Sequence, residues 1–204
     1  MDPATVRKSL GVQAVAFVAL GCGLWVYSGR ELSSFVSVTW REIGLGLAMG
    51  LGLIAVIAAL VRSFPAWGEK LVRLQAESFS VFGYPLSRKS MVFIAVCAGV
   101  GEEALFRAGL QTLAADHVPI ALAVVLASIP FTLLHASKPL VAVAQFGISC
   151  LLGFAYFATG SVLAVMVGHA AYDVFALWNL QRELERLDLV RKAEEDPDPE
   201  TEQD

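Results

Sequence analysis

Ionisable residues interrupt three apolar stretches in the second half of the chain, in patterns that could do chemistry. The stretches contain the segments Gly101-Glu102-Glu103-Ala104-Leu105-Phe106-Arg107, Phe131-Thr132-Leu133-Leu134-His135 and His169-Ala170-Ala171-Tyr172-Asp173. A charged side chain at the centre of a membrane span costs about 2.5–3.5 kcal/mol on insertion scales. This concentration therefore indicates a functional site more strongly than a polar knot that only holds helices together. The candidate site residues are Glu102, Glu103, Arg107, His135, His169 and Asp173.

The two adjacent acids are predicted to play different roles. Glu103 lies one helical turn before Arg107, in the favoured order for an ion pair, and this pair should hold Glu103 ionised. Glu102 is turned about 100° away on the helix and has no helical partner of opposite charge. A dry carboxylate without a cation has a raised proton affinity and suits a general base. We therefore expect Glu102 to be the base and Glu103 to support it.

The histidines complete a set suited to hydrolysis by activated water. His169 and Asp173 lie one turn apart and share a helix face. His135 follows Pro130, which removes a backbone hydrogen bond and can re-aim the end of the helix. A peptide bond inside the membrane is a natural substrate for such a set. The cavity should open to the cytoplasm, because His135 lies near the inner end of its span.

Other intramembrane proteases fit the sequence less well. The chain has no His-Glu-x-x-His motif, which would place two zinc ligands on one helix. It has no Gly-x-Gly-Asp motif, and Asp173 is the only aspartate in a predicted span, so a two-aspartate mechanism fails. Ser128, Ser149 and Ser161 lack the surroundings of an activated nucleophile.

The composition predicts an all-α membrane protein. Of the 204 residues, 56% are hydrophobic and 17% charged, more apolar surface than a soluble domain of this length can bury. We expect a polytopic bundle of about six transmembrane helices, with the active site between core helices of the second half. The sequence has no basic patch of the kind that binds nucleic acid, so we expect no nucleic-acid partner. The predicted spans are 9–27, 43–61, 91–115, 119–136, 139–158 and 161–180.

The distribution of basic residues predicts the orientation of this bundle. If the N-terminus is inside, the outer loops hold only Arg30 and Arg41, against twelve basic residues in the inner segments. Both termini should therefore be cytoplasmic, in a bacterial-type inner or plasma membrane. The inner set is Arg7, Lys8, Arg62, Lys70, Arg73, Arg88, Lys89, Lys138, Arg182, Arg186, Arg191 and Lys192.

The three ordered motifs resemble those of the CPBP family of CAAX prenyl proteases and bacteriocin-processing enzymes, also called the ABI family. The resemblance rests on Glu102-Glu103-x-x-x-Arg107, Phe131-x-x-x-His135 and His169-x-x-x-Asp173 and covers about residues 91–180. It implies that Glu102 and His135 activate water, while His169 and the residue four positions later stabilise the oxyanion. That residue is commonly Asn in the family. Asp173 must therefore be protonated, orient His169 or help to bind a metal.

The resemblance leaves the cofactor and the partners open. No cofactor is certain, and a divalent metal such as zinc would use Glu102, His135, His169 and Asp173. Expected partners are membrane lipid and a protein or peptide substrate cleaved near the membrane. The function expected first is a CAAX prenyl protease-like intramembrane endopeptidase, of glutamic or metallo type. The alternatives are a non-catalytic membrane regulator or bacteriocin-immunity protein and a proton or metal transporter.

Three regions follow from these patterns. Residues 1–90 should form two N-terminal transmembrane helices and an interfacial amphipathic loop, which serves as a lid, a substrate guide or only an anchor. Residues 91–180 should form the CPBP-like catalytic membrane core, and 181–204 a cytoplasmic amphipathic helix with an acidic disordered tail. The spacing of Gly46 and Gly50 predicts close helix packing, either within one subunit or in a homodimer.

Overall fold

The computed structural model describes residues 3–78 and 86–189, and the regular structure of these residues is helical. The all-α class is therefore confirmed. The elements in chain order are α1 (Pro3–Tyr27), the short 3₁₀ helix η1 (Leu32–Ser34), α2 (Trp40–Ser63), α3 (Pro65–Ser78), α4 (Arg88–Glu103), the π-helix η3 (Ala104–Gln111), α5 (Thr112–Ala115), α6 (Ile120–Leu134), α7 (Pro139–Thr159) and α8 (Val162–Arg186).

Four helices in the described part of the chain are long and apolar enough to cross a membrane: α1, α2, α7 and α8. The predicted span 91–115 is also helical, as the uninterrupted run α4–η3–α5, but it changes helix type at Ala104. The predicted span 119–136 corresponds to α6, which has 15 residues and falls short of a full crossing. A membrane protein is thus supported, and the count of about six spans stays a prediction.

The glycines of α2 let that helix approach α8 closely. A Cβ atom at Gly46 would lie 2.6 Å from the carbonyl oxygen of Ala164, and one at Gly50 would lie 2.8 Å from that of Gly168. Only glycine tolerates such contacts, since real Cβ atoms do not come that near a backbone oxygen. The small-residue spacing at Gly46 and Gly50 therefore serves packing within one subunit. It fixes the position of α8, which carries His169.

A π-helix follows the two acids of the third predicted span. In η3, the carbonyl of Arg107 accepts a hydrogen bond from the Thr112 hydroxyl at 2.9 Å, and that hydroxyl also contacts the Tyr156 hydroxyl at 2.9 Å. Single π turns are rare and occur often at functional sites. The segment is buried almost throughout and packs against α1 on one side and α6 and α7 on the other.

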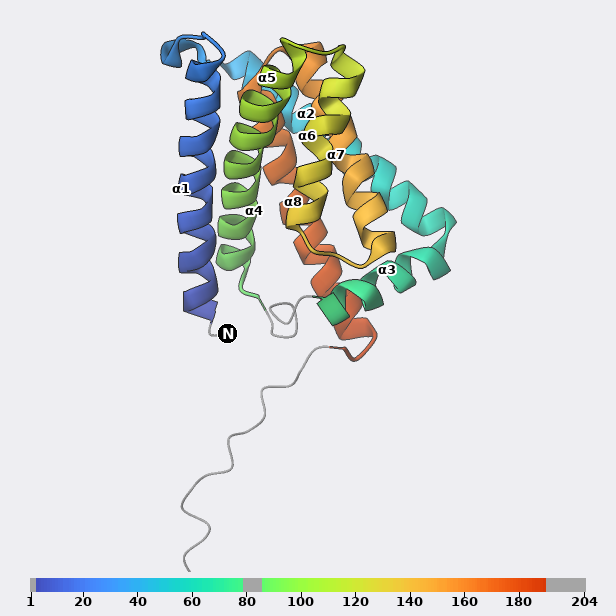
Figure 1. Ribbon diagram of the computed structural model, residues 1–204. Helices are drawn as coiled ribbons and strands as arrows, with labels where there is room; N and C mark the ends of the chain where they lie inside the picture. Colours follow the sequence, from blue (N-terminus) through green and yellow to red (C-terminus); the bar gives the residue numbers. More distant parts are fainter. Residues whose placement is uncertain (1–2, 79–85, 190–204) are drawn as a thin grey trace, which may run out of the picture.

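The interfacial segment predicted after α2 is helical in its first half. Helix α3 lies across the end of the bundle where α1 begins and α8 ends (Figure 1). Its Val72 packs against Leu180 and Leu184 of α8, which continues to Arg186 as one helix. Residues 79–85 of the predicted interfacial segment and the predicted acidic tail, from residue 190 on, lie outside the described residues.

Candidate active site

The fold brings together all six residues that the sequence singled out. Glu102 and Glu103 end α4, Arg107 lies one turn later in η3, His135 caps the C-terminus of α6, and His169 and Asp173 lie one turn apart in α8. The site is therefore built where three segments, far apart in the chain, pack side by side. The contact between Glu103 and His169 joins α4 to α8 directly, and Glu102 lies about 4 Å from both His135 and His169.

Glu103 and Arg107 form the ion pair that their spacing predicted. Arg107 Nε lies 3.1 Å from Glu103 Oε2, and neither side chain is exposed to solvent (0%). Arg107 Nη2 also donates to the backbone carbonyl and the hydroxyl of Ser149 on α7, both at 3.1 Å. The guanidinium carbon lies 5.3 Å from the centre of the Phe131 ring. Arg107 thus ties the acids of α4 to both α6 and α7.

Glu103 has a second partner that sequence reasoning missed. Its Oε1 lies 2.8 Å from His169 Nδ1. Because an ionised carboxylate only accepts hydrogen bonds, Nδ1 must carry the proton and the ring is held in one orientation. Nε2 of His169 then faces Glu102 Oε2 at 4.0 Å and Asp173 Oδ2 at 3.4 Å. The carboxylate that orients the His169 ring through Nδ1 is Glu103, and Asp173 lies at the other nitrogen.

His135 is positioned by the way α6 ends. The helix continues through Pro130 to Leu134, and Ala136 then adopts a left-handed conformation with φ 44°. His135 Nδ1 lies 2.8 Å from the Phe131 carbonyl oxygen, to which it can only donate. The ring also packs on the Phe131 ring, with centroids 4.7 Å apart. Nε2 is thereby left as a free acceptor, directed at Glu102 Oε1 at 3.9 Å.

Glu102 lies between the two imidazoles without touching either. Separations of 3.9 and 4.0 Å to the Nε2 atoms of His135 and His169 are too long for direct hydrogen bonds. They are suitable for a bridging water molecule. The side chain of Glu102 is 13% exposed, and those of Asp173 and His135 are 23% and 27% exposed. Burial therefore increases from His135 and Asp173 toward the Glu103–Arg107 pair, and the site opens on the side of His135.

A metal centre needs several donor side chains directed at one point. Among the described residues, no group of three or more His, Cys, Asp or Glu side chains is arranged so that it could hold one ion. The four predicted ligands Glu102, His135, His169 and Asp173 lie near one another, and the binding of a metal ion by them stays a prediction. The cysteines Cys22, Cys97 and Cys150 are free thiols.

Comparison with known proteins bears on the same part of the chain. The family described as type II CAAX prenyl endopeptidase Rce1-like matches residues 86–175. This stretch contains every candidate site residue and runs from the start of α4 into α8. No curated protein and no solved structure matches the chain. The resemblance to the CPBP family is therefore confirmed for residues 86–175, which match the Rce1-like family model.

Proposed function

We propose that this chain is an intramembrane endopeptidase that hydrolyses a peptide bond with water activated by Glu102 and His135. The observation that carries the proposal is the position of the Glu102 carboxylate, 3.9 Å from His135 Nε2 and 4.0 Å from His169 Nε2. A water molecule beside these groups can donate one hydrogen bond to the carboxylate and one to His135 Nε2. The Rce1-like match supports an activity of the CAAX protease type.

The reaction uses these groups in order. Glu102 removes a proton from the water while His135 Nε2 accepts its second hydrogen bond, and the water oxygen attacks the carbonyl carbon of the substrate. The carbonyl becomes an oxyanion, to which His169 donates a hydrogen bond from Nε2 when both ring nitrogens carry protons. Glu102 then passes its proton to the leaving nitrogen, and the C–N bond breaks. The products are a carboxylic acid, which still holds the second proton of the water, and an amine, which takes up that proton as the acid ionises.

The buried ion pair of Glu103 and Arg107 supports this reaction without touching the substrate. Glu103 compensates the charge of His169 during the step and keeps its Nε2 aimed at the site. In this proposal Asp173 is ionised, and its Oδ2 lies 3.4 Å from His169 Nε2. Zinc bound by Glu102, His135, His169 and Asp173 stays a separate prediction, and no step here depends on it.

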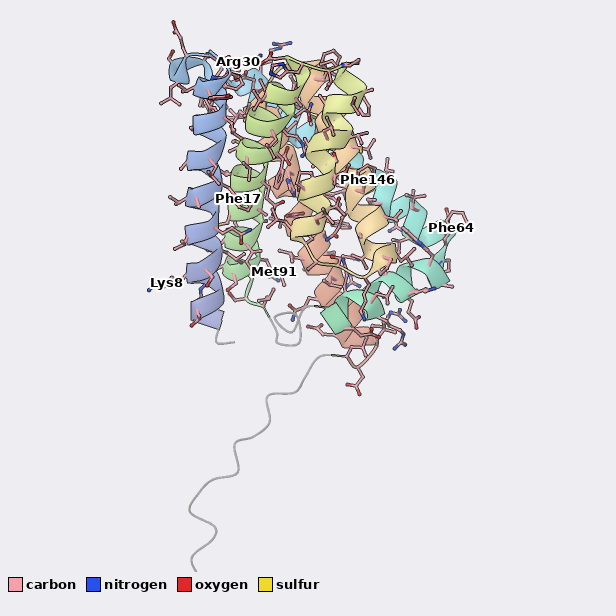
Figure 2. All side chains as sticks on the ribbon, viewed as in Figure 1. Lys8, Phe17, Arg30, Phe64, Met91 and Phe146 are labelled. Carbon is pink, nitrogen blue, oxygen red and sulfur yellow. The ribbon has the colours of Figure 1, made fainter. Side chains whose placement is uncertain are left out.

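The membrane orientation belongs to the same proposal. The α4–η3–α5 run and α6 complete a bundle of six spans, and both termini lie in the cytoplasm of a bacterial-type cell. The N-terminus of α1, helix α3 and the loop after His135 lie at one end of the molecule (Figure 1). Ten of the predicted inner basic residues lie in described segments, and Lys8 is at that end while Arg30 is at the other (Figure 2). Reporter fusions at both termini test this, and a C-terminus outside the cell would overturn it.

The activity is tested with purified protein in nanodiscs and quenched-fluorescent peptides, one with a prenylated C-terminal cysteine and one without. Glu102→Gln should lower turnover by about 100-fold or more. Glu31→Gln, which changes an acid near the opposite end, is the matched control and should keep full activity. Full activity in Glu102→Gln would contradict the assignment of the base. Loss of activity with chelator and recovery with zinc would support the metal prediction. Absence of turnover in the wild type would favour the non-catalytic regulator.

A further inference from the structure

A shallow groove runs along the outside of the bundle between α1 and α4. Its volume is about 370 Å³, and its lining contains none of the candidate site residues. Phe93, which lines the groove, and Glu102 are nine residues apart on α4, which places them on about opposite faces of the helix. The groove is lined by Arg7, Lys8, Gly11, Val12, Val15 and Phe93.

The two ends of this groove differ in chemistry. Along most of its length the walls are Val12, Val15 and the ring of Phe93, all exposed. Gly11 leaves the floor open, since a Cβ atom there would already contact the Phe93 ring at 3.6 Å. At the end where α1 begins, Arg7 and Lys8 close the groove with two positive charges. Figure 2 shows Lys8 and Met91 at this same end of the two helices.

The cations at this end have no acidic partner within the described residues. Arg7 Nη1 donates to the Ser90 hydroxyl at 3.2 Å, which directs the guanidinium toward α4 and leaves its other donors available. Arg88 and Lys89, which begin α4, add two more charges beside it. Elsewhere in the described chain, Arg30, Arg73, Lys138 and Arg186 are each paired with a carboxylate. The charge at the head of the groove therefore favours an anion from outside the protein.

We infer that this groove binds one anionic phospholipid, with an acyl chain along Val12, Val15 and Phe93 and the phosphate at Arg7 and Lys8. Guanidinium groups suit phosphate oxygens because they can donate two parallel hydrogen bonds. The basic end of α1 lies at the surface where headgroups are found, and the apolar walls extend from it toward the hydrocarbon. A lipid in this position joins α1 to α4, the helix that carries Glu102 and Glu103.

Native mass spectrometry of the full chain, with phosphatidylglycerol titrated against phosphatidylcholine, measures this binding. The double variant Arg7→Gln/Lys8→Gln should bind phosphatidylglycerol about 30-fold more weakly, from about 1 kcal/mol per cation near a lipid headgroup and about 1.4 kcal/mol per tenfold. Gly11→Leu should also weaken binding, because it fills the groove and leaves every charge in place. Arg62→Gln/Lys70→Gln removes the same two charges from exposed positions outside the groove and is the matched control.

The three variants separate a built site from general attraction to an anionic surface. The site is supported if the groove variants lose phosphatidylglycerol and the control does not, while melting temperatures in phosphatidylcholine stay at the wild-type value. Equal losses in the control and in Arg7→Gln/Lys8→Gln, or unchanged binding in Gly11→Leu, would overturn the proposal. Competition by glycerol phosphate without an acyl chain, at the affinity of the lipid, would also overturn it. None of these readings depends on peptidase activity.

Discussion

Replacing Glu103 by glutamine should destabilise the protein much more than the same change at its neighbour Glu102. In the native state the Arg107 guanidinium is fully buried and lies 3.1 Å from the Glu103 carboxylate. Breaking a buried ion pair from one side costs about 3–5 kcal/mol, because the remaining charge is left without compensation. Since Arg107 keeps its two hydrogen bonds to Ser149, the loss should be near the lower limit, about 3 kcal/mol.

Glu102→Gln is a sharp control for this prediction. Its carboxylate is 3.9 Å or more from its charged neighbours, so glutamine removes no ion pair at contact distance. We expect Glu102→Gln to fold and melt like the wild type and to lose activity. Glu103→Gln should lose both, because His169 also loses the ionised partner of Nδ1.

The measurement is the melting temperature in detergent micelles, followed by circular dichroism, together with peptide turnover. About 3 kcal/mol corresponds to a decrease of about 6–12 °C for a chain of this size. The double variant Glu103→Gln/Arg107→Met should recover part of this stability, because it no longer buries an unpaired cation. The reasoning is refuted if Glu103→Gln and Glu102→Gln melt at the same temperature. It is also refuted if the double variant melts at a lower temperature than Glu103→Gln.

Three further predictions concern residues around the site and the opposite end. Ser149→Ala should lower the free energy of unfolding by about 1.5 kcal/mol, because it removes a hydrogen bond to a charged group. It should also lower turnover, because Arg107 is held less firmly. Stability equal to wild type in the same melting assay would show that the backbone carbonyl of residue 149 suffices to hold Arg107. Asp173→Asn should lower activity if the aspartate is ionised, and a pH–rate profile with and without chelator measures this; undiminished, chelator-insensitive activity would return position 173 to the family's usual oxyanion role. The bidentate hydrogen bonds from Arg30 lower the pKa of Asp116 below its ordinary value of 3.8, so this pair adds stability above that pH and loses it as the pH falls through the lowered value. Asp116→Asn should therefore reduce the fall in melting temperature as the pH is lowered. An unchanged dependence of melting temperature on pH would show that the pair contributes nothing.

The contacts that sequence could predict are those within a single helix. Glu103 with Arg107 and His169 with Asp173 follow from the helical repeat, and both pairs are present in the structure. The spacing of Gly46 and Gly50 likewise predicted a close approach, although it did not name α8 as the partner.

The contacts that sequence could not predict depend on how separate helices are rotated about their axes. The bond between Glu103 and His169 joins residues 66 positions apart, and the bond between Arg107 and Ser149 joins residues 42 apart. Ser149 lacks the surroundings of a nucleophile, and its place on an apolar helix is a signal of a buried polar partner. The pattern of apolar residues in the sequence does not distinguish this π-helix from an α-helix. The π-helix explains why the third predicted span divides at Ala104.

The π-helix η3 also sets a phase difference between two parts of one span. Before Ala104, the α-helical repeat aims Glu102 and Glu103 at α8; after it, Gln111 donates to the Gly153 carbonyl of α7 at 2.9 Å. Because a π turn takes up one extra residue, deleting one residue within η3 would restore a plain α-helical repeat without turning the residues beyond it. A plain α-helix of the present length would instead turn those residues by about 100° relative to the acids. The directions in which the acids before Ala104 and the residues that face α7 after it point are therefore matched by the one extra residue that η3 takes up.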